Sequence, residues 1–564
     1  MDHISALNEM LDTVGQIPGD GKDRLEPFWN IARSLKQDSS FFQIYSDPLL
    51  QEKLSDLSKR LAGIIKAETD SMSLKTERLK DIAWCLNAEL SDNIEKIRTL
   101  MSHSEPCFNT LIIFKKINSV LNSIDRLEVR GRDSAGISLM FVLDASEFEK
   151  FKALLGQKNL AEEWAERTGK EILLNKSISV NNTSVSFAYK TAAEIGSLGD
   201  NVSFLRKQIQ NDMILKTIAG FPHQHHTVIS HTRWASVGAI TEPNCHPVDN
   251  RTVGNNTPSS IIHVCLNGDI DNYLELKNGC EAENRNLIPK DITTDTKIIP
   301  LQIEKYIRQG MDVTEAFRAS VRDFNGSHAI CMHTDLAPGK LFLAQKGSGQ
   351  AIFIGLAQDH YMPASEVYGF IEETSSYIKV DGEKTVEGKN GEKIQGQIFV
   401  LDQNSRGGLD GIKAMFYDGT PVELGDKDIK SSVITSRDID RQGFPHYFLK
   451  EISESPMSVE KTLLNRWEKT GDNRYAVVLD EKVFPKKIKE AILSNQIRRI
   501  FFVGQGTAGV AAQACADILT YYMNDPSFAI RSMKASEMSG FKLYDYGTME
   551  DSLLVAITQS GTTA

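Results

Sequence analysis

Two short loops near the end of the chain carry residues suited to holding a phosphate group. The first reads Gly504-Gln505-Gly506-Thr507-Ala508-Gly509 and lies between a predicted strand and a predicted helix. Glycines let the backbone approach a ligand closely, and the unpaired N–H groups at a helix start attract phosphate. The same G-x-G-x-x-G spacing is also typical of a dinucleotide site. This loop alone therefore does not distinguish a site for a single phosphate from a site for a dinucleotide.

That second loop favours a single phosphate and a sugar over a dinucleotide. It reads Thr558-Gln559-Ser560-Gly561-Thr562-Thr563 and follows a predicted strand at Leu553–Ile557. In a parallel sheet both loops lie at the carboxyl ends of their strands, so hydroxyl and amide groups meet there. With Ala535-Ser536-Glu537 between them, the loops resemble the sugar-isomerase (SIS) fold, which binds phosphosugars.

Four segments in the middle of the chain occur in a fixed order. Each is weak alone, because Asn-Gly after a strand is commonly a turn and Asp-Thr before a helix is commonly a cap. They are Arg130-Gly131-Arg132-Asp133-Ser134-Ala135-Gly136, His231-Thr232-Arg233-Trp234-Ala235, Leu266-Asn267-Gly268-Asp269-Ile270-Asp271-Asn272 and Thr294-Asp295-Thr296. As a set they resemble the class II glutamine amidotransferase domain, a glutaminase of the N-terminal-nucleophile type. Together with the SIS-like loops they resemble the glutamine–fructose-6-phosphate aminotransferase (isomerising) family of amino sugar biosynthesis.

This resemblance implies a role for each matching residue. Arg233 would bind the α-carboxylate of glutamine, a planar task that suits a guanidinium, and Asp295 would hold the α-ammonium group. The Asn267 side-chain N–H and the Gly268 backbone N–H would form an oxyanion hole. The remaining residues would line the glutamine pocket (Trp234 and Ser236) or hold fructose-6-phosphate (Thr507, Thr558, Gln559, Ser560 and Thr563). The resemblance implies no metal and no other cofactor.

Several positions depart from the family pattern. Arg132 stands where the family has a tyrosine, and Ala508 removes a hydroxyl donor from the first phosphate loop. The family's Trp-Ala-Thr-His-Gly run reads Trp-Ala-Ser-Val-Gly, so Val237 replaces a histidine that would contact glutamine.

The most consequential departure concerns the nucleophile. In this class the nucleophile is an N-terminal cysteine in a Cys-Gly-Ile strand, whose α-amino group, with a pKa of about 8, serves as the base. This chain begins Met1-Asp2-His3 and contains no Cys-Gly-Ile. Cys107 is the only candidate by spacing, but its use would require cleavage after Pro106, and a structural thiol is the alternative.

Two hypotheses therefore stay open. In the first, the chain is an incomplete glutamine-dependent amidotransferase that makes glucosamine-6-phosphate from fructose-6-phosphate and glutamine. It would lack the N-terminal cysteine and a second SIS domain, which we expect beyond Ala564. In the second, it is a non-catalytic phosphosugar-binding or regulatory protein with a degenerate glutaminase domain. An NAD-dependent enzyme is a third, less favoured hypothesis, because the second loop is rich in hydroxyl groups.

The elements that must position these residues change in type along the chain. Apolar residues recur every three or four positions in the first hundred residues, as at Leu79, Ile82 and Leu86, which predicts packed amphipathic helices. Short β-rich runs from Ile137–Leu143 onward predict antiparallel sheets, and alternating strands and helices after about Ile452 predict a parallel sheet.

The expected fold class is α+β followed by α/β: an N-terminal-nucleophile-type antiparallel sandwich, then a partial parallel-sheet SIS domain, with an extra N-terminal helical region. We expect a helical extension or insertion at 1–106 and a class II glutamine amidotransferase-like domain at 107–404, with a helical insertion at about 144–176. A connecting segment at 405–450 and the partial SIS domain at 451–564 follow.

Composition limits the classes of partner. The 564 residues include 64 Lys and Arg against 75 Asp and Glu, giving a net charge of −11, which argues against a nucleic-acid partner. No apolar run approaches the ~18 residues of a membrane span. Seven scattered cysteines form no disulfide framework, which indicates a cytoplasmic protein. A polar loop is favoured over a metal site at His223, His225 and His226. The expected partners are glutamine and fructose-6-phosphate, and a homodimer is one possibility.

Overall fold

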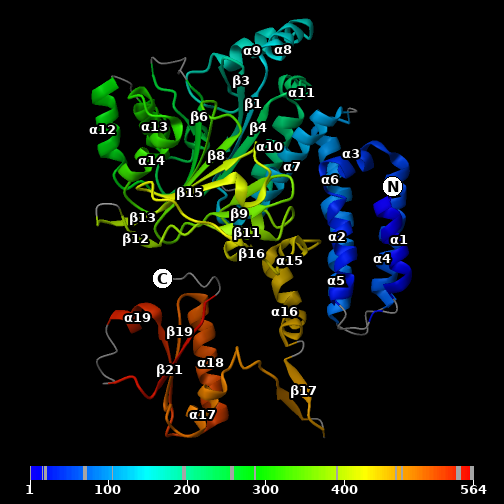
Figure 1. The fold of residues 1–564 in the computed structure, drawn as a ribbon, viewed down its shortest axis with the longest axis vertical. Helices are drawn as coiled ribbons and strands as arrows, with labels where there is room; N and C mark the ends of the chain where they lie inside the picture. Colours follow the sequence, from blue (N-terminus) through cyan, green and yellow to red (C-terminus); the bar gives the residue numbers. More distant parts are fainter. Residues whose placement is uncertain are drawn as a thin grey trace. The chain divides into compact units, whose positions relative to one another are not determined.

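In the computed structural model the chain forms two units, Met1–Asp440 and Arg441–Ala564 (Figure 1). The structure describes residues 2–14, 17, 22–67, 73–103, 106–192, 198–253, 260–284, 288–388, 391–463, 466–471, 474–540 and 548–558.

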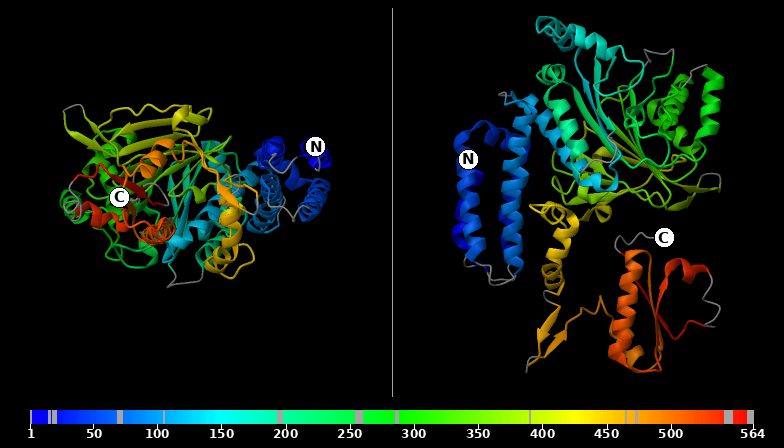
Figure 2. Two further views of the ribbon diagram at one scale, coloured as in Figure 1. Left: turned by 90° about the horizontal axis from the view of Figure 1, so that it is seen from below. Right: turned by 180° about the vertical axis from the view of Figure 1, so that it is seen from behind.

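The first unit begins with the helical region that the sequence predicts. Its elements are α1 (Asp2–Thr13), α2 (Glu26–Ser34), α3 (Asp38–Ser46), α4 (Pro48–Ala67), α5 (Leu74–Trp84), the π-helix η3 (Cys85–Ser91) and α6 (Asp92–Leu100). The predicted apolar stripe is buried throughout, with Leu79, Ile82 and Leu86 each fully covered. The stripe continues from α5 into the π-helix, because η3 begins at the residue after α5 ends. The two segments form one continuous helix with one buried face (Figures 1 and 2).

A long helix, α7 (Phe108–Leu127), leads from this region into the first sheet. The sheet is antiparallel with the order β2-β3-β1-β4. Its strands are β1 (Ser134–Val142), β2 (Ile178–Asn181), β3 (Ser184–Ala192) and β4 (His225–Arg233). All nine residues of β1 are buried, as expected of a central strand covered on both faces. The helices between these strands are α8 (Ala145–Gln157), α9 (Ala161–Thr168), α10 (Asp200–Gln210) and α11 (Met213–Ala219), of which α8 and α9 lie in the range predicted as a helical insertion.

The second sheet is also antiparallel and has the order β15-β14-β8-β7-β6-β5. Its strands are β5 (Val248–Asp249), β6 (Ile262–Gly268), β7 (His328–Thr334), β8 (Lys340–Lys346), β14 (Gln397–Asp402) and β15 (Ile412–Phe416). Helices α12 (Tyr273–Asn284), α13 (Ile298–Arg308) and α14 (Val313–Asp323) share an apolar core with one face of this sheet. Smaller sheets are formed by β9 (Phe353–Leu356), β10 (Tyr361–Ala364), β11 (Ser376–Lys379) and β16 (Lys430–Ser431), and by β12 (Thr385–Glu387) and β13 (Lys393–Gln395).

The two large sheets face each other through polar side chains. Ser138 on β1 lies 2.7 Å from His263 Nδ1 on β6 and 3.0 Å from His333 Nε2 on β7, and all three residues are buried. The stacked antiparallel sheets that the sequence predicts for this part of the chain are therefore confirmed.

Residues 405–440 differ from the connecting segment that the sequence suggests. Strand β15 extends the second sheet, where Ala414, Met415 and Phe416 are buried, and the short helix α15 (Ser436–Ile439) ends the first unit. Glycine and aspartate residues typical of turns lie on both sides of β15, and five residues are too few to show a clear strand pattern.

The second unit contains a three-stranded parallel sheet of order β20-β19-β21, as predicted. Its strands are β19 (Arg499–Gly504), β20 (Ala529–Lys534) and β21 (Ser552–Ala556), and α18 (Thr507–Met523) connects the first two. The other elements are α16 (Tyr447–Leu463), β17 (Trp467–Lys469), β18 (Tyr475–Val477), α17 (Lys486–Leu493) and α19 (Ala535–Gly540).

Candidate functional site

Two glycines of the first motif allow the start of β1 to pack closely against Arg233 and His246. A Cβ on Gly131 would lie 2.8 Å from the carbonyl carbon of Arg233, and one on Gly136 would lie 2.2 Å from the carbonyl oxygen of His246. Ser134 is paired with Arg233 in the β1–β4 ladder. Glycine is therefore required at both positions for packing, and the first two motifs lie side by side.

Arg233 ends β4 and turns its guanidinium into the loop that follows it. The side chain is 4% exposed, and it donates hydrogen bonds to the carbonyl oxygens of Val237 and, at 3.2 Å, Ala239. Burial lowers the pKa of Arg233, while Asp295 and Asp133 oppose that effect. A guanidinium stays charged in a protein, so Arg233 is a fixed cation that also shapes its own loop.

Hydrogen bonds tie this loop to two other predicted segments. Ser236 Oγ donates to Asp269 Oδ1 at 2.7 Å, and the backbone N–H of Ile270 donates to Asp295 Oδ2 at 2.8 Å. Burial raises the pKa of Asp295, and the nearby carboxylate of Asp269 raises it further. Arg233 and Ser236, from the loop after β4, and Asp295, from a distant loop, are thus linked through the loop after β6.

The predicted oxyanion residues stand at the end of β6. Gly268 has a φ of +97°, and a Cβ there would lie 2.2 Å from the carbonyl oxygen of Ser327. Asn267 is half-buried and is paired with Ala329 in the ladder between β6 and β7. Gly268 therefore bends the chain out of the strand next to the Asp269 contact, and its role toward an oxyanion stays a prediction.

Trp234 is exposed to solvent and is not packed into the wall of a pocket. Its side chain is 71% exposed, and the neighbouring backbone N–H of Ala235 is held by Asp133 Oδ2 at 2.9 Å. The backbone next to Trp234 is held in place, but the indole itself is exposed. The contact between Trp234 and a ligand therefore stays a prediction.

Cys107 is not brought to this group of residues. It caps the N-terminus of α7, whose 20 residues span about 30 Å, whereas Gly131, just beyond the other end of that helix, packs on Arg233. Partial burial raises the pKa of the Cys107 thiol, but hydrogen bonds with Thr110 and backbone N–H groups outweigh this and lower it. The thiol lies at the start of a helix, away from the residues of the candidate glutamine site.

Cys245 does lie near Arg233 but has a structural environment. It is fully buried, and its Sγ donates to the carbonyl oxygens of Thr191 at 3.0 Å and Ala135 at 3.2 Å. Burial raises the pKa of this thiol. A buried neutral thiol with its hydrogen bonds inside the fold is a poor nucleophile.

Asn244 is a positioning residue that the sequence analysis did not single out. Its Oδ1 accepts from the backbone N–H groups of Thr293 at 2.7 Å and Thr294 at 2.9 Å, and its Nδ2 donates to the carbonyl oxygen of Asp291 at 3.0 Å. The side chain is completely buried. It fixes the loop that carries Asp295, and the only sequence signal was its place in the run Asn-Cys-His-Pro between two motifs.

In the second unit, the glycine-rich loop follows β19 as predicted. Gly506 has a φ of +60°, and a Cβ on Gly504 would lie 2.5 Å from the carbonyl oxygen of Ala508. Thr507 is exposed at the first turn of α18, and Thr558 is exposed just after the neighbouring strand β21. Gln559, Ser560 and Thr563 lie outside the described residues. The two described threonines follow adjacent parallel strands, where exposed backbone N–H groups can hold a phosphate.

Within the described ranges, no three or more His, Cys, Asp or Glu side chains are grouped as metal ligands. Among the same residues, no helix is both long and apolar enough to cross a membrane.

Comparison with known proteins agrees with the motifs. The chain is 29% identical over 337 residues to the glutamine–fructose-6-phosphate aminotransferase (isomerising) of Methanothermobacter thermautotrophicus, covering 60% of this chain and 47% of that protein. It is 28% identical over 338 residues to the enzyme of the same name from Sulfolobus acidocaldarius, covering 59% and 47%. The chain thus spans about half the length of the curated relatives it matches.

No protein-family model matches the chain. A solved structure of glutamine phosphoribosylpyrophosphate amidotransferase from B. subtilis is 13% identical with a TM-score of 0.30, covering 72% of this chain and 70% of that one. The resemblance to glutamine–fructose-6-phosphate aminotransferases that the motifs predict is confirmed by the sequence relatives.

Proposed function

We propose that the first unit is a glutamine-binding amidotransferase module and that the protein acts in amino transfer from glutamine to fructose-6-phosphate, which gives glucosamine-6-phosphate. The observation that supports this most strongly is the linkage of the loop that holds Arg233 and Ser236 to the distant Asp295, through Asp269 and Ile270 of the loop after β6. Both sequence relatives are named glutamine–fructose-6-phosphate aminotransferase (isomerising), and that name contains the two proposed substrates.

Glutamine would bind as a zwitterion between opposite charges. The guanidinium of Arg233 has five N–H donors in a planar fork, so donors remain for an α-carboxylate beside the two carbonyls it already holds. The Asp295 carboxylate, fixed by the Ile270 N–H, would accept the α-ammonium group. A ligand cation would favour the ionised form of Asp295, whose pKa burial raises.

The side-chain amide of glutamine would then point toward Asn267 and Gly268. In the reaction a thiolate attacks the amide carbon, the carbonyl oxygen becomes an oxyanion held by N–H donors, and ammonia leaves as a thioester forms. Water hydrolyses the thioester to glutamate and frees the thiol. Cys107 lies at one end of α7, a helix about 30 Å long, whereas Gly131 beyond its other end packs on Arg233; Cys245 is buried with its thiol engaged. We therefore expect Cys107 and Cys245 not to release ammonia from bound glutamine, so the proposed amino transfer requires a thiol beside Asn267 and Gly268 that neither of them provides.

The second unit would bind the sugar phosphate. Thr507 and the N–H groups at the start of α18 would hold the phosphate, with Thr558 from the neighbouring loop. Gln559, Ser560 and Thr563 complete this proposed set.

A non-catalytic phosphosugar-binding or regulatory protein is the second candidate. It is favoured by the environment of the two thiols and by Val237, which stands where the family has a histidine. Both candidates share the sugar-phosphate site and differ in whether glutamine binds.

Titration calorimetry on the purified chain with L-glutamine, D-glutamine, glucosamine-6-phosphate and NAD separates these candidates. Binding of L-glutamine and glucosamine-6-phosphate, but not of D-glutamine or NAD, is the expected result. Glucosamine-6-phosphate binding without glutamine binding would support the regulatory candidate. Binding of NAD alone would overturn both, and an ammonia-release assay then tests whether bound glutamine is hydrolysed.

A further inference from the structure

The helical region at residues 2–100 contacts the segment where the chain leaves the first unit. The indole Nε1 of Trp84 donates to Ser436 Oγ at 2.8 Å, and Ser436 Oγ donates to Glu89. Ser436 is 2% exposed and lies in α15, some 350 positions along the chain from its partners. Trp84 and Glu89 flank and occupy the π-helix η3 (Cys85–Ser91), a local widening often associated with functional contacts.

The next residue strengthens this contact with two ion pairs. Arg437 Nε donates to Asp81 Oδ1 at 2.9 Å, and Arg437 Nη2 donates to Glu77 Oε2 at 2.8 Å. All three side chains are mostly covered, at 18%, 12% and 13% exposure. Burial raises the pKa of Glu77, but hydrogen bonds with Lys80 and Arg437 outweigh it and lower the pKa to about 2. Such partly buried charge-assisted pairs resist separation more than surface pairs do.

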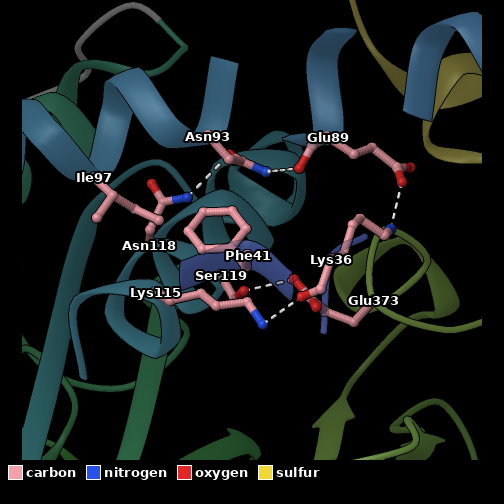
Figure 3. A pocket seen from close by; sticks show the side chains of 9 residues that line it. All are labelled: Lys36, Phe41, Glu89, Asn93, Ile97, Lys115, Asn118, Ser119 and Glu373. Carbon is pink, nitrogen blue, oxygen red and sulfur yellow. Dashed lines mark hydrogen bonds and ion pairs between the residues drawn. The ribbon is translucent and has the colours of Figure 1, made fainter. Parts of the chain in front are cut away.

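On its other side the same helical region is joined to the sheet sandwich through a small polar cavity (Figure 3). Lys36 pairs with Glu89, and Lys115 on α7 donates to the carbonyl oxygen of Lys36 at 2.6 Å. Asn118, also on α7, donates to Asn93 Oδ1 at 3.0 Å. The cavity has room for about one water molecule, so the surfaces around it are closely fitted.

Glu89 connects the two contacts, because it accepts from Ser436 and from Lys36, and Lys36 Nζ also donates to the carbonyl oxygen of Glu372 in the sandwich. The loop before β11 adds Glu372, which accepts hydrogen bonds from Asn93 and from Arg126 on α7. The helical region is thus fixed to the sandwich, and the exit segment is fixed to the helical region.

We propose that the helical region is an interaction surface for the exit segment 432–440, with Glu77, Asp81, Trp84 and Glu89 as its anchoring residues. Its partner is this chain's own Ser436 and Arg437. This contact, which we call the anchor, holds the end of the first unit, up to Asp440, on the helical region. This gives a role to a part of the chain for which the motifs offer none.

Limited trypsin digestion of the full chain tests the anchor. Trypsin cleaves after arginine, and Arg441 follows the anchored segment directly. In the double variant Glu77→Gln/Asp81→Asn, Arg437 loses both charged partners, so we expect cleavage after Arg441 to be about tenfold faster, because it follows the population of the detached segment. The matched control Asp56→Asn/Glu95→Gln removes two exposed acids from the same helical region, paired with Lys59 and Arg98, and should leave the rate unchanged.

Trp84→Phe keeps an aromatic side chain while it removes the indole N–H donor, so it provides a second test of the contact with no change of charge. We expect faster amide exchange in residues 432–440 in this variant and in the double variant, with exchange of β1 unchanged. Cleavage and exchange equal to the wild type in both variants would overturn the anchor. Equal acceleration in the Asp56→Asn/Glu95→Gln control would also overturn it, since the effect would then be a general one of lost charge.

Discussion

Ser236 Oγ donates a 2.7 Å hydrogen bond to Asp269 Oδ1, and this single contact joins the loop after β4 to the loop after β6. Arg233 begins the first of these loops, and Gly268 begins the second. The contact is therefore a short link between the proposed carboxylate-binding and oxyanion-binding residues.

The first prediction concerns this link. Ser236→Ala removes the donor and lets the two loops separate, so we expect glutamine affinity to fall about tenfold, equivalent to about 1.4 kcal/mol. Ser230→Ala is the matched control, because Ser230 Oγ donates to the carbonyl oxygen of Gly136 and not to either loop. Titration calorimetry measures both, and an unchanged affinity in Ser236→Ala would show that the link does not order the site.

The second prediction concerns Arg233. Lysine has a point charge in place of a planar fork, so Arg233→Lys cannot hold the carbonyl oxygens of Val237 and Ala239 together with a ligand carboxylate. We expect glutamine affinity to fall by about 100-fold, with faster amide exchange in residues 234–240. Arg130→Lys is the control, because Arg130 is exposed and pairs with Glu366 at the surface. Equal losses in both variants would remove Arg233 from the proposed site.

Much of the fold could be predicted from local patterns. The apolar stripe through Leu79 and Leu86 marks helices because one face is buried, and the parallel sheet follows from alternating strands and helices. Strand β15 was missed because five residues between glycines and aspartates carry too little periodicity to stand out from a loop. The order of strands in the sheets could not be predicted from local patterns, because β1 pairs with β3 and β4, which are both distant from it in the sequence.

The candidate site was predicted in part for a similar reason. Arg233 and Asp295 could be named because their motifs match a family. Asp269 lies in one of those motifs but its bond with Ser236 could not be foreseen, and Asn244, which acts through backbone N–H groups, lies outside all four motifs. The position of Cys107 could not be judged from spacing, because a helix of 20 residues converts a short sequence separation into about 30 Å.

The third prediction compares two glycines. Gly268 has a φ of +97° and no room for a Cβ beside the Ser327 carbonyl oxygen, so Gly268→Ala should lower the free energy of unfolding by about 2 kcal/mol or more. Gly279, inside α12, has nothing within 4 Å of its would-be Cβ, so Gly279→Ala should raise that free energy by about 0.5–1 kcal/mol. Urea unfolding followed by circular dichroism measures both. A stabilising Gly268→Ala would mean that the bend after β6 is not required.

The fourth prediction concerns the buried histidines of the sandwich. Burial lowers the pKa of His231 from 6.5 to about 4 and that of His263 to about 3. The unfolded chain therefore binds protons below pH 6.5 that the folded chain does not, and stability must fall as the pH drops through that range. His360 acts in the opposite direction: burial lowers its pKa, but the hydrogen bond with Asp359 and the negative charges of Glu373 and Asp359 together outweigh burial and raise it.

Each such histidine contributes a slope of about 1.4 kcal/mol per pH unit below pH 6. We measure the free energy of unfolding by urea titration between pH 7.5 and pH 4.5. We expect it to fall toward pH 4.5 with a slope that corresponds to the uptake of more than one proton on unfolding. In His263→Asn the slope should be shallower by about one proton, because one lowered pKa is removed while Ser138 keeps its contact with His333. The same slope in His263→Asn and the wild type would mean that His263 is not held neutral between the sheets.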